Sequence, residues 1–116
     1  MRDLSSLKER YLRDPFEKRL GNLASDFSRL EWACSHPKES DMLSDLLRQM
    51  KHITEWIAQD APLSIQEVMA DIQPRLSMWS LIWPRLGAQP QFRNAVARES
   101  LAWSHKLLKL AGSGKG

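Results

Sequence analysis

The chain has few of the residues that mark disulfide-bonded, disordered or membrane proteins. Cys34 is its one cysteine among 116 residues, which excludes an internal disulfide. Five glycines and six prolines are too few for a linker-rich or disordered chain. No apolar run approaches the roughly 20 residues that a membrane-spanning helix needs. The N-terminal residues MRDLSSLKER lack the apolar core of an export signal. We therefore predict a cytoplasmic protein that makes no membrane contact.

Charge is distributed unevenly along the chain. Residues 1–71 carry 10 basic and 13 acidic side chains, whereas residues 72–116 carry 7 basic side chains and a single acidic one, Glu99. The basic residues between positions 75 and 109 predict a surface that could attract nucleic acid. In the other interpretation they face the acidic middle of the same chain and stay solvated.

Apolar residues recur in steps of four and three, a spacing that keeps them on one face of an α-helix and that a strand cannot produce. Stripes of this kind predict helices over residues 3–13, 15–35, 38–59, 65–86 and 90–110, and no strand-like alternation interrupts them. The fold class that follows is all-α: an up-and-down antiparallel bundle of four main helices plus a short N-terminal helix. We expect one domain over residues 1–111 and a disordered tail over residues 112–116. The clearest stripe consists of Phe16, Leu20, Leu23, Phe27, Leu30 and Cys34.

Local signals place the helix ends. Asp14 is a suitable N-cap and Pro15 suits a first helical position, so a helix begins there or continues the preceding one through a kink. Ser64 and Glu67 have the spacing of a capping box, and apolar residues at positions 63 and 68 have that of a hydrophobic staple. These signals predict a helix start at Ile65.

Glycine and proline inside the stripes carry further expectations. Gly21 lies within a helix beside its apolar stripe, which predicts the close approach of another helix. Pro74 removes a backbone hydrogen bond, so a kink or a short break is expected at that position. Gly87 is a natural C-cap.

Tryptophan is abundant, and its positions suggest a contact surface. Three of the five lie along or beside the stripes and predict a tryptophan-rich core, with an aromatic ligand pocket as the alternative: Trp79, Trp83 and Trp103. The other two lie off the stripes and are predicted to be exposed. With the apolar side of the first helix they form the surface that we predict to bind a protein partner or a second copy in a homodimer: Leu4, Leu7, Tyr11, Trp32 and Trp56.

The segment RESLAWSH, which contains Arg98 and His105, resembles a motif of the HEPN superfamily, in which Arg is followed after four to six residues by His. HEPN proteins are small helical bundles, and many are ribonucleases. The resemblance implies that His105 acts as a general acid or base and that Arg98 steadies a phosphate. The residue beside the arginine is Glu99, where the superfamily has Asn or Asp. The alternative function is thus a HEPN-like bundle that binds RNA or DNA, with or without ribonuclease activity.

The remaining motifs predict neither a cofactor nor a metal ion. His52 and Glu55 share a helix face, but no second such pair completes a metal site. His52 also lacks the Lys and Gly that follow the active histidine of phosphotransfer domains. The terminal AGSGKG lacks the Ser or Thr and the following helix that a phosphate-binding loop requires.

A broader likeness covers the chain from Arg19 onwards. The stretch RLGNLASDFSRLEW, followed by an acidic amphipathic helix and a tryptophan-containing C-terminal half, resembles small uncharacterised helical proteins of cyanobacteria. This resemblance implies no activity and no site residues. The sequence as a whole favours a non-enzymatic module for protein interaction or self-association over an enzyme.

Overall fold

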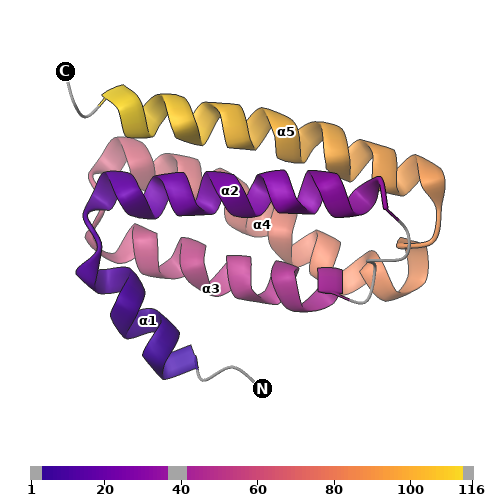
Figure 1. Ribbon diagram of the computed structural model, residues 1–116, viewed down its shortest axis with the longest axis horizontal. Coiled ribbons are helices and arrows are strands. Elements are labelled where there is room, and N and C mark those ends of the chain that lie inside the picture. Colours follow the sequence, from indigo (N-terminus) through magenta and orange to yellow (C-terminus); the bar gives the residue numbers. More distant parts are fainter. Residues whose placement is uncertain (1–3, 37–41, 114–116) are drawn as a thin grey trace.

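The computed structural model describes residues 4–36 and 42–113, except for the side chains of Leu4, Leu7, Tyr11 and Ser113 (Figure 1). Within these ranges the chain forms helices and no strand, which confirms the predicted all-α class. The helices are α1 (Leu4–Arg13), α2 (Phe16–Cys34), α3 (Leu43–Asp60), α4 (Leu63–Leu86) and α5 (Pro90–Ser113).

The four long helices run alternately in opposite directions, as Figure 1 shows. Helix α2 packs against α5 and α3, α3 packs against α4, and α1 contacts α3 from outside the bundle. The apolar stripes meet in one core. Its largest fully buried side chains include Trp79, Phe27, Leu20, Leu23, Leu30, Leu43, Leu47, Met50, Ile53, Ile57, Met69 and Ile72.

Helices α2 and α5 pack most closely because small residues lie between them. The Ser104 hydroxyl donates to the backbone oxygen of Ala24 at 2.9 Å. The hydroxyl oxygens of Ser28 and Ser104 are also 2.9 Å apart. Since Ser104 has used its only hydrogen, Ser28 is the donor in this second bond. Side chains of this size let the two backbones approach along their length.

The boundary between α1 and α2 is a break rather than a kink. Pro15 is the N-cap of α2, with φ −57° and ψ 152°, and its side chain makes no capping bond. The predicted cap, Asp14, has another role. Its backbone oxygen accepts a hydrogen bond from Arg19 Nε at 3.1 Å, and its carboxylate pairs with Lys18 at 3.5 Å.

Helix α4 begins at Leu63, two residues before the predicted start, so the capping-box interpretation is wrong. Pro62 is the N-cap, and its backbone oxygen accepts from the amides of Ile65 and Gln66 at 3.0 Å. Ser64 lies inside the first turn, where it cannot act as the cap. Leu63 is 71% exposed and makes no staple with the core. The rigid proline sets the helix start in place of the polar side chains.

Pro74 does not break α4, which continues through it to Leu86. Its ring lies on the exposed side of the helix, where the unpaired carbonyl of Ala70 can be solvated. At the other boundaries, α5 reaches Ser113 and includes two residues of the predicted tail, while residues 114–116 lie outside the described part. The predicted start of the third helix at residues 38–41 is also outside it.

The two glycines of interest have opposite surroundings. A Cβ at Gly21 would meet nothing within 4 Å, so the prediction that another helix approaches it is wrong. Gly87 is the C-cap of α4, as predicted, with a right-handed backbone at φ −61°. A Cβ there would lie 2.7 Å from both the indole Nε1 and the backbone oxygen of Trp83. Close packing, and not backbone strain, therefore requires glycine at position 87.

Alanine substitutions at these glycines are expected to change stability in opposite directions. Gly21→Ala should raise the free energy of unfolding by up to about 1 kcal/mol, because alanine favours the helix and fills empty space. Gly87→Ala should lower it by about 1–3 kcal/mol, because the methyl group overlaps the Trp83 indole. Urea denaturation of both variants measures the effect. A stabilised Gly87→Ala would contradict the close contact.

A matched pair of serine substitutions tests the hydrogen bonds between α2 and α5. The Ser100 hydroxyl is buried and has no hydrogen-bond partner among the described residues. Ser100→Ala is therefore expected to stabilise the fold by about 1 kcal/mol, whereas Ser104→Ala should destabilise it by about 1 kcal/mol through its lost bonds. Both changes raise helix propensity equally, so the difference between their unfolding free energies isolates the hydrogen bonds. Equal values for the two variants would contradict this assignment.

Candidate functional site

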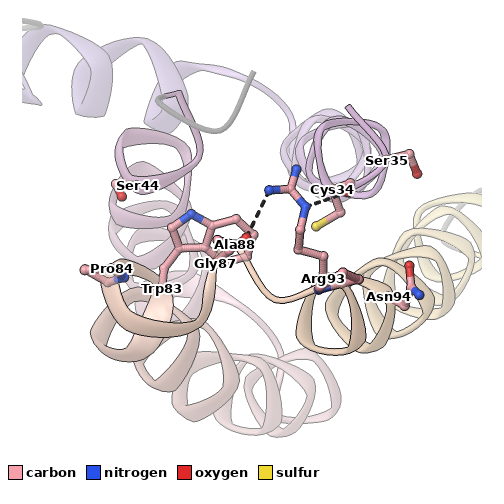
Figure 2. Close-up of a pocket in the computed structure, with 10 residues that line it drawn as sticks. Cys34, Ser35, Ser44, Trp83, Pro84, Gly87, Ala88, Arg93 and Asn94 are labelled. Carbon is pink, nitrogen blue, oxygen red and sulfur yellow. Dashed lines mark hydrogen bonds between the residues drawn. The ribbon is translucent and has the colours of Figure 1, made fainter. Parts of the chain in front are cut away.

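A buried arginine joins three helices at one end of the bundle (Figure 2). Arg93, near the start of α5, is 5% exposed. Its Nε and Nη2 donate to the backbone oxygens of Cys34 and Ala33, both at 2.9 Å, and its Nη1 donates to that of Gly87 at 3.0 Å. These oxygens lie at the C-terminal ends of α2 and α4, where helix dipoles favour a cation. The guanidinium is thus committed to the fold.

A hollow of about 780 Å³ opens beside this arginine. Trp83 forms part of its wall, with its ring centroid 5.7 Å from the Arg93 guanidinium carbon and 5.5 Å from the ring of Phe92. The described residues that line it include no carboxylate and no histidine. General acid–base catalysis needs such a group within reach of a substrate, so this lining does not supply one.

Cys34 lines the same hollow and is buried, as its place on the apolar stripe predicts. Burial raises the pKa of its thiol to about 11, although the charge of Arg93 lowers the pKa in part. The thiol therefore stays protonated at neutral pH. Because the thiolate is the nucleophile and the metal ligand, Cys34 has the character of a core residue and not of a reactive one.

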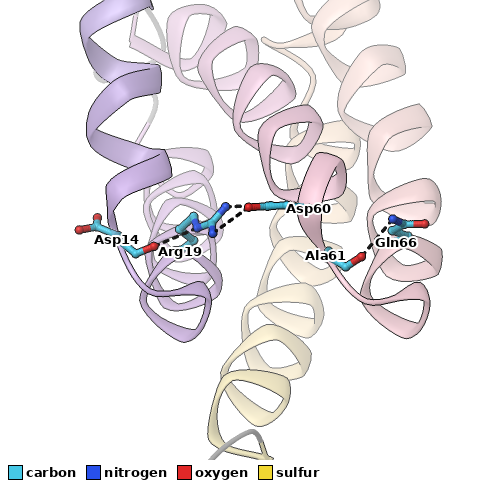
Figure 3. A network of polar contacts seen from close by, with 5 residues as sticks. All are labelled: Asp14, Arg19, Asp60, Ala61 and Gln66. Atoms are coloured by element: carbon cyan, nitrogen blue, oxygen red, sulfur yellow. Dashed lines mark hydrogen bonds and ion pairs between the residues drawn. The ribbon is translucent and has the colours of Figure 1, made fainter.

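A second arginine fastens the opposite end of the bundle (Figure 3). Arg19 is buried, and its two terminal nitrogens pair with the carboxylate oxygens of Asp60 at 3.0 and 3.2 Å. Its Nε bond to the Asp14 carbonyl ties the α1–α2 junction to the end of α3. Nearby, Gln66 donates to the backbone oxygen of Ala61 at 3.0 Å and closes the α3–α4 turn. This network has a structural role.

The basic C-terminal third is partly neutralised within itself. Arg75 on α4 makes a two-pronged ion pair with Glu99 on α5, at 2.8 and 2.6 Å, and Trp103 Nε1 donates to the same carboxylate at 3.2 Å. Arg75 and the buried Arg93 are therefore two basic side chains between residues 75 and 109 that stabilise the fold. The acidic partner of Arg75 is Glu99 and not a residue from the middle of the chain.

The residues of the HEPN-like motif are exposed but stand apart from the hollow. Arg98 and His105 lie on α5, two turns or about 10 Å apart along its axis. Neither is among the described residues that line the hollow beside Arg93. The catalytic role that the resemblance implies for them stays a prediction.

The two tryptophans of the predicted partner surface differ in exposure. Trp56 is only 6% exposed, so the prediction that it offers an exposed contact is wrong: the buried face of α3 is wide enough to include it beside Ile53 and Ile57. Trp32 is 51% exposed, as expected, and stacks on His36 with ring centroids 3.9 Å apart. The side chains that complete the surface lie outside the described part of the structure: Leu4, Leu7 and Tyr11. The predicted core tryptophans are buried or half-buried: Trp79, Trp83 and Trp103.

An apolar surface that the sequence interpretation missed lies on the outer side of α4. Leu81 is 78% exposed, and at helical spacing it shares its face with four other exposed residues. We call this set the α4 outer stripe: Leu63, Ala70, Pro74, Met78 and Leu81. The signal was present in the sequence, because α4 is apolar on two sides, and a helix that is apolar all round is normally covered on all sides.

The described residues contain neither a cluster that could hold a metal ion nor a helix that could span a membrane. No group of three histidine, cysteine or carboxylate side chains among them could hold a metal ion, and His52 and Glu55 form an isolated pair at 3.9 Å. In the same ranges, no helix combines the length and apolar composition needed to cross a bilayer.

The Cys34 thiol is expected to make stability fall at alkaline pH. The unfolded thiol titrates at its ordinary pKa of 9.0 and the folded one at about 11, so stability is full below pH 9 and is lost as the pH rises to 11. The loss should reach about 2 kcal/mol. Urea denaturation of the native chain and of Cys34→Ala, at about pH 8 and pH 10.5, isolates this contribution. A stability difference between the two proteins that does not change with pH would contradict it.

Comparison with known proteins leaves the geometry as the only guide to function. A scan against protein-family models and searches of curated proteins and solved structures each found no significant match to this chain. The resemblance to small helical proteins of cyanobacteria therefore stays a prediction. No family assignment follows from these comparisons.

Proposed function

We propose that this chain is a non-enzymatic helical-bundle module that binds another protein chain through the α4 outer stripe. One observation carries the proposal: Leu81, in the second half of a 24-residue helix, is 78% exposed among other apolar residues. Contiguous apolar surface that a protein leaves exposed commonly marks an interaction site. An exposed stripe along one rigid helix suits recognition by a second helix, whose side chains would pack between its ridges.

The chemistry of the buried polar groups supports binding rather than catalysis. The guanidinium of Arg93 is occupied by backbone oxygens, Arg19 is paired with Asp60, and the Cys34 thiol is protonated at neutral pH. These groups stabilise the ends of the bundle. The outer stripe, in contrast, contributes little to the core of the chain that carries it.

The remaining surfaces rank below the α4 outer stripe. Trp32 offers a smaller exposed aromatic contact on α2. Binding of RNA or DNA is the second candidate, favoured by the exposure of Arg98 and His105 on α5. It should weaken steeply with salt, whereas binding through an apolar stripe should not. A nuclease activity that survives His105→Ala would rule out the catalytic role of that residue.

A photo-crosslinking residue at position 81 tests the proposed function directly. Introduced into the full chain in its native cells, it is expected to form a covalent adduct with a protein, because the stripe is covered by a partner chain. The same residue at position 101, an exposed leucine of α5, is the matched control. The adduct should be absent or much weaker there. A position 81 that crosslinks no more than position 101 would contradict the proposal.

A further inference from the structure

Two exposed residues of opposite charge lie on the face of the α4 outer stripe, on the side of its midline where Met78 lies. Glu67 and Arg85 are 18 positions apart, which is five turns at 3.6 residues per turn. They therefore project from α4 in the same direction, one toward each end of the helix. Both are exposed, and neither forms an ion pair with another described residue.

These two side chains cannot satisfy each other within one chain. Along a straight helix, 18 residues span about 27 Å, far beyond the reach of an ion pair. In the free chain both charges are exposed and solvated. A molecule that covers this face is favoured if it presents a basic residue near Glu67 and an acidic residue near Arg85. The molecule must also be apolar between those points, because the stripe is.

We propose that this molecule is a second copy of the chain, with the two α4 helices packed antiparallel about a two-fold axis near Leu76. The inference rests on the proposed function and names its partner. Under this symmetry a residue on one side of the stripe's midline meets the same side of the other copy. Glu67 then lies opposite Arg85 of the second copy, and Arg85 opposite its Glu67, so that one interface contains the ion pair twice.

The apolar residues fit the same register. The axis near Leu76 places Leu81 at the level of residue 71 of the second copy, where its neighbours on the stripe are Ala70 and Pro74. The most exposed side chain of the stripe thus meets a short one, Ala70, which allows the helices to approach closely. Met78 lies two residues from the axis, at the level of Pro74 of the second copy and about one turn from its own counterpart. Its flexible thioether can adapt to either contact.

Charge also determines the direction of the pair. A parallel arrangement would set Glu67 against Glu67 and Arg85 against Arg85, and like charges across an interface are repulsive. In the antiparallel arrangement Asp71, one turn from Glu67, adds a second carboxylate near Arg85 of the other copy. Glu67, Asp71 and Arg85 therefore all favour the antiparallel direction.

Charge reversal in the full chain gives the sharpest test. The molar mass should be measured by light scattering over a concentration series at low and moderate salt. The native chain is expected to pass from monomer to dimer. Leu81→Glu should weaken the dimer about tenfold or more, while Leu101→Glu on α5 leaves it unchanged. Glu67→Arg and Arg85→Glu should each weaken it about fivefold.

The double variant Glu67→Arg/Arg85→Glu is decisive, because it restores opposite charges only between antiparallel copies. It is expected to return the dimer to about twofold of the native affinity. Circular dichroism should show that all variants keep the helical fold, since every substituted residue is exposed. A native chain that is monomeric throughout, or a double variant as weak as the single ones, would overturn the antiparallel pair.

The two proposals fail in different ways. If position 81 crosslinks to a different protein while the purified chain stays monomeric, self-pairing is wrong and the proposed function stands. If position 81 crosslinks to nothing and the chain is monomeric, both are wrong. An adduct of twice the chain mass, together with rescue by the double variant, supports both.

Discussion

One buried cation, the guanidinium of Arg93, fixes the positions of three helices relative to one another. Arg93 reaches the C-terminal oxygens of α2 and the oxygen of the residue after α4 from the first turns of α5. A charge removed from water is costly unless several groups replace its hydration. The helix ends must therefore stay where they are, and with them Gly87, whose missing side chain leaves room for the Trp83 indole. Arg19 performs a similar function at the opposite end, but its partner Asp60 is half-exposed.

The period of the apolar residues was enough to predict the class and order of the helices, because side chains three and four apart share a helix face whatever they pack against. Predictions that depended on tertiary neighbours were less successful. Nothing local to Gly21 shows whether another helix passes it. At the start of α4, the fixed backbone of Pro62 acts two residues before the polar side chains that suggested a capping box. Trp56 lies at the edge of a stripe, and only the assembled bundle shows that the edge is covered.

For the same reason, only part of the candidate site could be predicted from the sequence. The exposure of Trp32 follows from its place off the stripe of α2. The buried tryptophans of α4 define one strong apolar face, and the apolar residues opposite them form a second whose exposure only the assembled bundle shows. A helix of the bundle has room for only one face in the core. An excess of apolar residues on such a helix is therefore informative about partners and not about the fold.

Pro74 leaves a polar group, the backbone carbonyl of Ala70, within the α4 outer stripe. The ring lacks the amide that would bond the carbonyl of Ala70, and both residues lie on the exposed side of α4. A chain that covers this face must offer a donor to that oxygen or leave a water molecule beside it. The backbone at the centre of an otherwise apolar stripe therefore sets one polar requirement that any covering chain has to meet.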